Sequence, residues 1–130
     1  MEKRIINPWT YQDNFGYVQA IEVKNQQGIL YCSGQAALNA EGQPSTDDMS
    51  SQLAQALENL ETVIKESGYR CEDIVRLNIF TTSVSEILAC FDVFTNWSAK
   101  HNVRQTSTLL GVTGLFIDSL KVEVEATVVK

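Results

Sequence analysis

One amphipathic segment in the middle of the chain constrains the fold more than any other feature. Apolar residues recur in it at three- and four-residue steps: Met49, Leu53, Ala56, Leu57, Leu60, Val63 and Ile64. Polar residues fill the positions between them, so the spacing predicts an amphipathic helix of about four turns. Asp47 and Asp48 favour its N-terminus through the helix dipole, and Gly68 suits its C-terminal cap. Such a helix has to bury one face against another layer.

The C-terminal segment, residues 121–129, has the period of a strand. Its apolar face would comprise Val122, Val124, Ala126 and Val128. Its polar face would carry Lys121, Glu123, Glu125 and Thr127. Strict alternation of this kind predicts a strand with one buried face.

Further strands are expected elsewhere in the chain. Their ranges are 3–6, 18–23, 29–32, 74–82 and 108–112. Residues 25–28 read Asn-Gln-Gln-Gly and supply turn chemistry. We therefore expect 18–23 and 29–32 to pair as an antiparallel hairpin.

A second helix is expected after the strand at 74–82. Ser83-Val84-Ser85-Glu86 is a capping box, which opens helices. The apolar face behind it would comprise Ile87, Leu88, Phe91, Phe94 and Trp97, and the helix should end near residues 100–102. Because these aromatic residues recur at helical spacing, we expect them to pack in the core.

This order of elements predicts one α+β domain over residues 1–130. We expect a mostly antiparallel sheet of about six strands with two helices on one face. The helices can cover only that face, so the other is a candidate surface for oligomerisation.

Composition excludes several classes of protein. The 130 residues include 16 acidic, 10 basic and one histidine residue, His101, for a net charge of -6. That balance argues against a nucleic-acid partner, and a lone histidine makes a zinc site improbable. No apolar run reaches the length of a membrane span, and the first ten residues lack an apolar signal core. Three dispersed cysteines suggest reduced thiols, so we expect a cytoplasmic protein.

Five short stretches are informative when taken together: residues 16–20 (GYVQA), 30–35 (LYCSGQ), Gln52 with 57–60 (LENL), 73–76 (DIVR) and 122–126 (VEVEA). In this order they resemble the RidA family, also called the YjgF family. The resemblance implies a chorismate-mutase-like fold and a homotrimer with three clefts, each lined by two adjacent subunits. Active members of the family are cytosolic deaminases that hydrolyse reactive 2-imino acids to 2-keto acids and ammonia without a cofactor or a metal.

The resemblance also assigns roles to individual residues. The family's water-orienting glutamate falls on Glu123, its cleft tyrosine on Tyr17, and the serine and glycine of its SGQ stretch on Ser33 and Gly34. Imine hydrolysis needs a carboxylate that aims water at the imine carbon, donors that position the substrate, and an anchor for the substrate carboxylate.

The anchor is where this sequence departs from the family. Active relatives have an arginine that opens a strand after a Pro-Ala-like pair. Alignment back from Gly111 without a gap places Ser107 at that position and Gln105 at the proline of a related R-P-A-S-T pattern. Arg104 lies three residues earlier and is the one candidate replacement.

The residues also admit simpler interpretations. Glu123 fits the polar face of a strand, Tyr17 fits interface packing, and Arg104 fits a solvated loop. Cys32 lies within an apolar strand, which favours a buried thiol over a nucleophile. Ser107 has no evident base partner, because the single imidazole of His101 falls at a helix end.

Three functions therefore stay open. The first is an imine or enamine deaminase in which Glu123 orients water and Tyr17, Ser33, Gly34, Ser107 and Arg104 contact the substrate. The second is a non-catalytic trimeric module that binds a small carboxylate or keto acid. The third, a ribonuclease or translation inhibitor, is disfavoured by the charge of -6 and the single histidine.

Overall fold

The computed structural model describes residues 1–130 and contains six strands and three α-helices. The strands are β1 (Glu2–Ile6), β2 (Ala20–Lys24), β3 (Ile29–Ala36), β4 (Ile74–Thr81), β5 (Thr106–Gly111) and β6 (Val122–Val129). The α-helices are α1 (Met49–Glu66), α2 (Val84–Ala89) and α3 (Asp92–Lys100). Short 3-10 turns span Tyr11–Phe15 and Cys71–Asp73. None of the helices combines the length and the apolarity that a membrane span requires.

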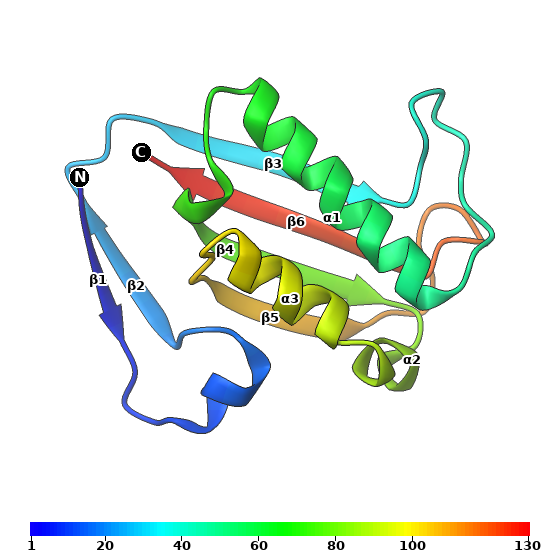
Figure 1. Ribbon diagram of the computed structural model, residues 1–130, viewed down its shortest axis with the longest axis horizontal. Helices are drawn as coiled ribbons and strands as arrows, with labels where there is room; N and C mark the ends of the chain where they lie inside the picture. The colour runs from blue at the N-terminus through cyan, green and yellow to red at the C-terminus, as the bar shows by residue number, and fades with distance from the viewer.

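The strands form two sheets. The main sheet has the order β3-β6-β4-β5, in which β4 and β5 are parallel and the other pairs antiparallel. β1 and β2 form a separate antiparallel pair to one side (Figure 1). α1 and α3 lie across one face of the main sheet (Figure 1). The expected α+β class is confirmed, and the six strands are divided into two sheets rather than joined in one.

The core lies between α1 and the main sheet. On α1, Leu53, Ala56, Leu60 and Ile64 have no exposed surface, and on β6 Val122, Val124 and Val128 are equally buried. Each buried Leu, Ile or Val contributes about 1.5–3 kcal/mol through the hydrophobic effect, so this contact between helix and sheet dominates the stability. The spacing of apolar residues in the α1 and β6 segments therefore predicted the buried face of each element correctly.

The caps of α1 also follow the sequence. Asp48 is the N-cap, and its Oδ1 accepts a hydrogen bond from the Ser51 amide at 3.0 Å. That bond stabilises the carboxylate, which lowers the pKa of Asp48. Ser67 is the C-cap, and Gly68 follows it with a φ of 77°, a left-handed conformation that glycine adopts without strain.

The predicted hairpin between 18–23 and 29–32 is wrong. β2 pairs with β1, whereas β3 pairs with the C-terminal strand β6. The residues of the expected turn instead join two sheets, and Gly28 exchanges backbone hydrogen bonds of 2.8 and 3.0 Å with Lys130. β6 offers β3 a longer partner with a buried apolar face, and that long-range contact overrides the local turn signal.

The second helix is also not continuous. Ser83 caps it as predicted, since its Oγ accepts a hydrogen bond from the Glu86 amide. The helix ends at Ala89, Cys90 leaves the helical conformation with φ of -125° and ψ of 26°, and α3 begins at Asp92. The break allows Phe94 to enter the core while Leu88 stays 51% exposed. The sequence had assigned both residues to one buried stripe.

Candidate functional site

Glu123 and Gly34 face each other across neighbouring strands. Glu123 on β6 stands beside Ala36 on β3 and Phe80 on β4. The register of β3 shifts between Cys32 and Gln35, which places Ser33 and Gly34 in an irregular stretch. A Cβ atom at position 34 would overlap the Glu123 carboxylate. The φ of Gly34 is not in the left-handed region, so an alanine here would disturb the position of the Glu123 side chain and not the backbone.

The carboxylate of Glu123 is unengaged in this chain. It takes part in none of the side-chain hydrogen bonds or ion pairs of the structure, and neither does the exposed hydroxyl of Ser33. We call Ser33, Gly34 and Glu123 the carboxylate half of the site. In it, the unpaired carboxylate of Glu123 lies next to the exposed backbone of Gly34.

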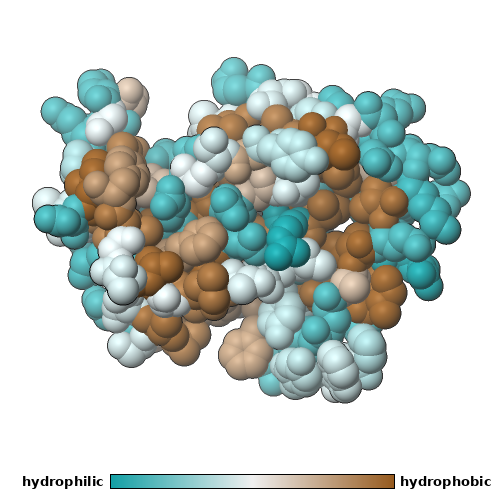
Figure 2. All heavy atoms as spheres, turned by 180° about the vertical axis from the view of Figure 1, so that it is seen from behind, coloured by the Kyte–Doolittle hydropathy of each residue, from teal (hydrophilic) through white to brown (hydrophobic).

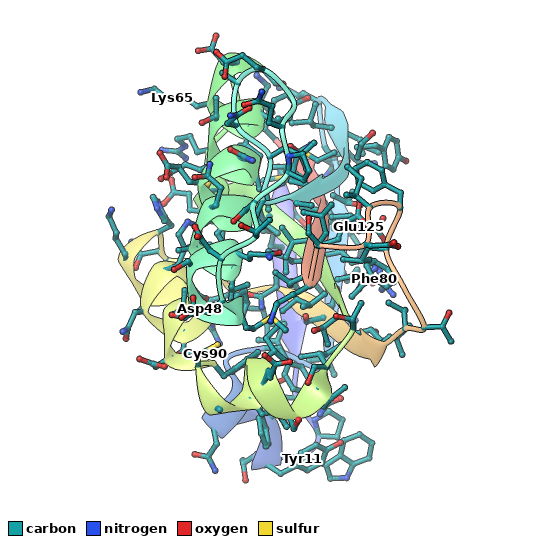
Figure 3. All side chains as sticks on the ribbon, turned by 90° about the vertical axis from the view of Figure 1, so that its right-hand side faces the viewer. Tyr11, Asp48, Lys65, Phe80, Cys90 and Glu125 are labelled. Atoms are coloured by element: carbon teal, nitrogen blue, oxygen red, sulfur yellow. The ribbon has the colours of Figure 1, made fainter.

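Glu125 has the same spacing but a different environment. Its Oε1 accepts a hydrogen bond from Asn78 Nδ2 at 3.2 Å, and Asn78 Oδ1 accepts one from the Thr108 amide at 3.2 Å. Both glutamates project from the face of the sheet that the helices leave uncovered. Figure 3 shows Glu125 and Phe80 on the side away from the helices. Glu125 is held in place, and Glu123 is free to bind water.

Tyr17 and Ser107 lie together in a different place. They line a cavity of about 270 Å³ whose other walls come from the end of the Tyr11–Phe15 turn, from β4 and β5, and from the α2–α3 region. We call this the apolar cavity, because Phe15, Leu88 and Phe91 are typical of its lining. Ser107 stands beside the fully buried Leu77 on β4, and its Oγ donates a hydrogen bond to the Leu77 carbonyl at 2.6 Å.

Ser107 and Glu123 therefore point to opposite faces of the main sheet. Ser107 shares the face of Leu77, which the helices cover, while Glu123 shares the face of Phe80. The structure brings Gly34 to the Glu123 carboxylate, with Ser33 next to Gly34 in the irregular stretch of β3, and it brings Tyr17 to Ser107. It does not bring the two pairs together within one chain.

Gln105 positions the segment that carries Tyr17. Its side chain has no exposed surface, and its Nε2 donates a hydrogen bond to the Gly16 carbonyl at 3.1 Å. Its own carbonyl accepts a hydrogen bond from the Val18 amide at 2.9 Å. These two bonds hold both neighbours of Tyr17 against the start of β5. The sequence comparison treated Gln105 only as a substitute for proline, and proline has no side-chain donor.

Arg104 lies outside the apolar cavity. It is exposed, forms no ion pair, and lines a neighbouring hollow of about 240 Å³ together with Asp13 and Tyr17. It is also remote from Glu123. Thr106, two residues beyond Arg104, pairs with Arg76, while Glu123 pairs with Phe80 on the same strand. Four residues of β4, about 13 Å, separate these positions.

The remaining candidate nucleophiles and bases are engaged elsewhere. His101 is the C-cap residue of α3, and its Nε2 lies 2.6 Å from Glu61 Oε1. Cys32 and Cys71 are buried as thiols, and burial raises the pKa of Cys32 and raises that of Cys71 to about 11. Ser107 therefore has no imidazole or thiolate beside it. Cys32 and His101 have the structural placements that the sequence predicted.

The fold and the two groups of residues define an α+β protein whose site is split between opposite faces of one sheet. A sequence model of the family described as endoribonuclease L-PSP matches residues 12–130. The chain belongs to this family, which is the RidA or YjgF family that the sequence motifs indicated.

Individual relatives agree with this placement. A Rid-family protein of unknown function from Yersinia pestis, YyfB, has the same fold with a TM-score of 0.87 and 29% identity over 100% of both chains. A RutC family protein of Aquifex aeolicus is 27% identical over 88% of each chain. A 2-iminobutanoate/2-iminopropanoate deaminase of Dermatophagoides farinae is 33% identical over 70% of each chain.

Sequence reasoning missed the walls of the apolar cavity. Leu88 and Phe91 were assigned to the core face of a continuous helix, and Phe15 was not singled out. The Gly16-Tyr17 pair was the available signal, because a left-handed glycine at φ of 74° ends the turn that carries Phe15.

Proposed function

We propose that this protein is a deaminase that hydrolyses small reactive imines or enamines to carbonyl compounds and ammonia, with water oriented by Glu123. The free carboxylate of Glu123 beside Gly34 is the observation that carries the proposal. Membership of the family supports it, since a relative that is 33% identical is named as an imine deaminase.

The reaction requires the protein mainly to orient a water molecule. A water molecule donates a hydrogen bond to the Glu123 carboxylate, which aims the water oxygen at the imine carbon. The new C–O bond forms as the C=N double bond becomes single and its nitrogen takes a proton. The C–N bond then breaks, ammonia leaves, and the carbonyl product remains. One imine and one water thus give one carbonyl compound and one ammonia, and no oxidant or reductant is needed.

We also propose that the protein is a homotrimer. The carboxylate half and the apolar cavity diverge within one chain, so a complete site needs the carboxylate half of one subunit beside the apolar cavity of the next. The face of the main sheet opposite the helices carries hydrophilic and hydrophobic side chains side by side (Figure 2). It includes Tyr31, which is 77% exposed, and Leu110, which is 48% exposed, and it has the mixed character of a surface between subunits.

We also propose a cytoplasmic location, because the three cysteines are unpaired and two of them are buried as thiols. RNA is a poor substrate for this chain. A net charge of -6 repels phosphates, and no imidazole lies beside either half of the site.

The test compares two glutamates on one strand. Glu123→Gln keeps the shape of the side chain but weakens its hydrogen-bond acceptor, and Glu125→Gln is the matched control. Imines are released by an amine or amino-acid oxidase and trapped with semicarbazide, so an active deaminase lowers the yield of semicarbazone. We expect Glu123→Gln to lose about 100-fold or more in rate and Glu125→Gln to stay within about threefold of wild type. Equal losses in both variants would contradict the role of Glu123.

A non-catalytic module is the second candidate, and the serine at position 107 is the observation that favours it. Such a protein would bind a small carboxylate or keto acid and accelerate no imine hydrolysis. Ligand binding raises the unfolding temperature by mass action, so a panel of keto acids in a thermal-shift assay separates the two functions.

A further inference from the structure

The apolar cavity is suited to a different part of a substrate from the one that an arginine would hold. Its lining contains no charged side chain, and its polar members are Tyr17 and Ser107. The hydroxyl proton of Ser107 is already donated to the Leu77 carbonyl. Arg104 faces another hollow. A carboxylate in the apolar cavity would lose its water shell and gain no cation in exchange, which is strongly unfavourable.

The apolar walls of this cavity are not covered by the rest of the chain. Phe15 and Leu88 are each 51% exposed, and Val84 is 38% exposed, although all three are large apolar residues. Removing such surfaces from water is favourable by about 25 cal/mol per Å² in general. An apolar group placed among them would gain from that burial.

The size of the cavity limits the occupant to a small molecule. Its volume of about 270 Å³ is equivalent to roughly nine water molecules at about 30 Å³ each. It is slightly below the usual range of ligand sites, which begins near 300 Å³. A phenyl ring or a branched alkyl chain with a reactive carbon attached fits this volume.

We infer that the substrates of this protein are uncharged imines or enamines with a small apolar group, which enters the cavity between Tyr17 and Ser107. This inference rests on the proposed deaminase function and narrows it to a substrate class. The reacting carbon then lies at the mouth of the cavity, where the carboxylate half of the neighbouring subunit supplies water. Hydrolysis of benzaldimine by this route gives benzaldehyde and ammonia.

Binding and catalysis are tested separately with the chain of residues 1–130. Benzamide and benzoate are nearly identical in shape and differ in charge, so calorimetric titration of both reports on the cavity without any reaction. We expect benzamide to bind at least about tenfold more tightly than benzoate, a difference of about 1.4 kcal/mol. Tighter binding of benzoate would overturn the inference.

Two variants probe the cavity walls. Ser107→Arg adds a cation and fills part of the space, so we expect it to reverse the preference and favour benzoate. Asn96→Arg adds the same charge at an exposed position of α3 and should leave the preference unchanged. Leu88→Trp fills the cavity without charge and should weaken benzamide binding. Unchanged benzamide binding in Leu88→Trp would also overturn the inference.

Catalysis is measured with four imines that vary charge and size independently. Benzylamine and ethylamine give uncharged imines, and phenylalanine and alanine give 2-imino acids. We expect the largest acceleration with benzaldimine, and faster hydrolysis of 2-iminopropanoate than of benzaldimine would overturn the substrate class. Failure with all four imines would count against the proposed deaminase function, whereas a retained preference for benzamide would still support the ligand class.

Discussion

The two halves of the candidate site differ in how they interact with water. The carboxylate half keeps a charged group in contact with water and leaves its acceptor atoms free, beside a glycine that offers only backbone. The apolar cavity gathers apolar side chains around a serine that is already hydrogen-bonded. One half is suited to holding water, and the other is suited to excluding it. Their placement on opposite faces of one sheet means that a single chain cannot combine them.

The comparison also explains why the missing arginine need not abolish catalysis. In the proposed mechanism Glu123 orients the water, and that residue is present with the close glycine beside it. The arginine would act in the other half, where it would select substrates by their charge. Under this proposal, loss of the arginine would change specificity before it changed the chemical step.

The largest expected effect comes from the carboxylate half. Gly34→Ala places a methyl group where the Glu123 carboxylate lies, and the flexible end of Glu123 has to move aside. We expect a loss of about 100-fold in deaminase rate, because orientation of the water is lost. The stability should change little, since alanine tolerates the backbone conformation at position 34.

The control for Gly34→Ala is Gly114→Ala. A Cβ atom at position 114 would meet nothing within 4 Å, so this variant should keep both activity and stability. Rates from the semicarbazide assay and urea unfolding curves measure the two effects separately. If Gly34→Ala lowers the unfolding free energy by as much as it raises the activation free energy of the reaction, the role of Gly34 is structural.

An intermediate effect is expected from the segment that supports the apolar cavity. Gln105→Leu keeps the volume of the side chain but removes the donor to the Gly16 carbonyl. A fully buried carbonyl without a donor costs about 1–3 kcal/mol. Because Gly16 is only half-buried and leucine also removes the unpartnered buried Oε1 of Gln105, we expect a loss near the lower end, which urea unfolding detects. Tyr17 is then less firmly held, so benzamide should bind more weakly while the role of Glu123 is unchanged.

Gln26→Leu is the matched control for Gln105→Leu, because Gln26 is exposed between β2 and β3. We expect its unfolding free energy to stay within about 0.5 kcal/mol of wild type. Equal stability of the two variants would show that the bond to Gly16 contributes nothing to the fold.

The sequence predicted the fold class because its strongest periods were local. The helical stripe from Met49 to Ile64 and the alternation from Val122 to Val128 each define one buried face, and both faces are buried as expected. The partners of the strands were not predictable in the same way. β3 pairs with β6 almost a hundred residues away, and no local turn signal reports such a contact.

The site was predictable only in part, for a related reason. Short motifs made Tyr17, Gly34, Glu123 and Ser107 candidates, but the face of the sheet on which a strand residue lies depends on strand register. The break at Cys90 also depends on tertiary packing, because the sequence on both sides of it has helical spacing. Residues on both sides of that break line the apolar cavity, so its walls could not be inferred from the pattern alone.

The smallest expected effect concerns the thiols that adjoin the two halves. Cys32 directly precedes Ser33 in the carboxylate half, and Cys90 directly precedes Phe91 in the apolar cavity. Burial raises the pKa of both thiols, but Cys32 is 7% exposed whereas Cys90 is half-buried. At pH 8 we expect iodoacetamide to modify Cys90 several-fold faster than Cys32, with mass spectrometry of peptides as the readout.

The third cysteine, Cys71, predicts how the unfolding free energy depends on pH. Its pKa is raised from 9.0 to about 11 by burial, by the charge of Glu61 and by Cys32. The unfolded chain loses this proton near pH 9 and the folded chain only near pH 11, so the stabilising contribution is complete below pH 9 and is lost as the pH rises towards 11. Cys71→Ala should flatten the fall in unfolding free energy over that interval. A fall that is just as steep in Cys71→Ala would assign it to other groups.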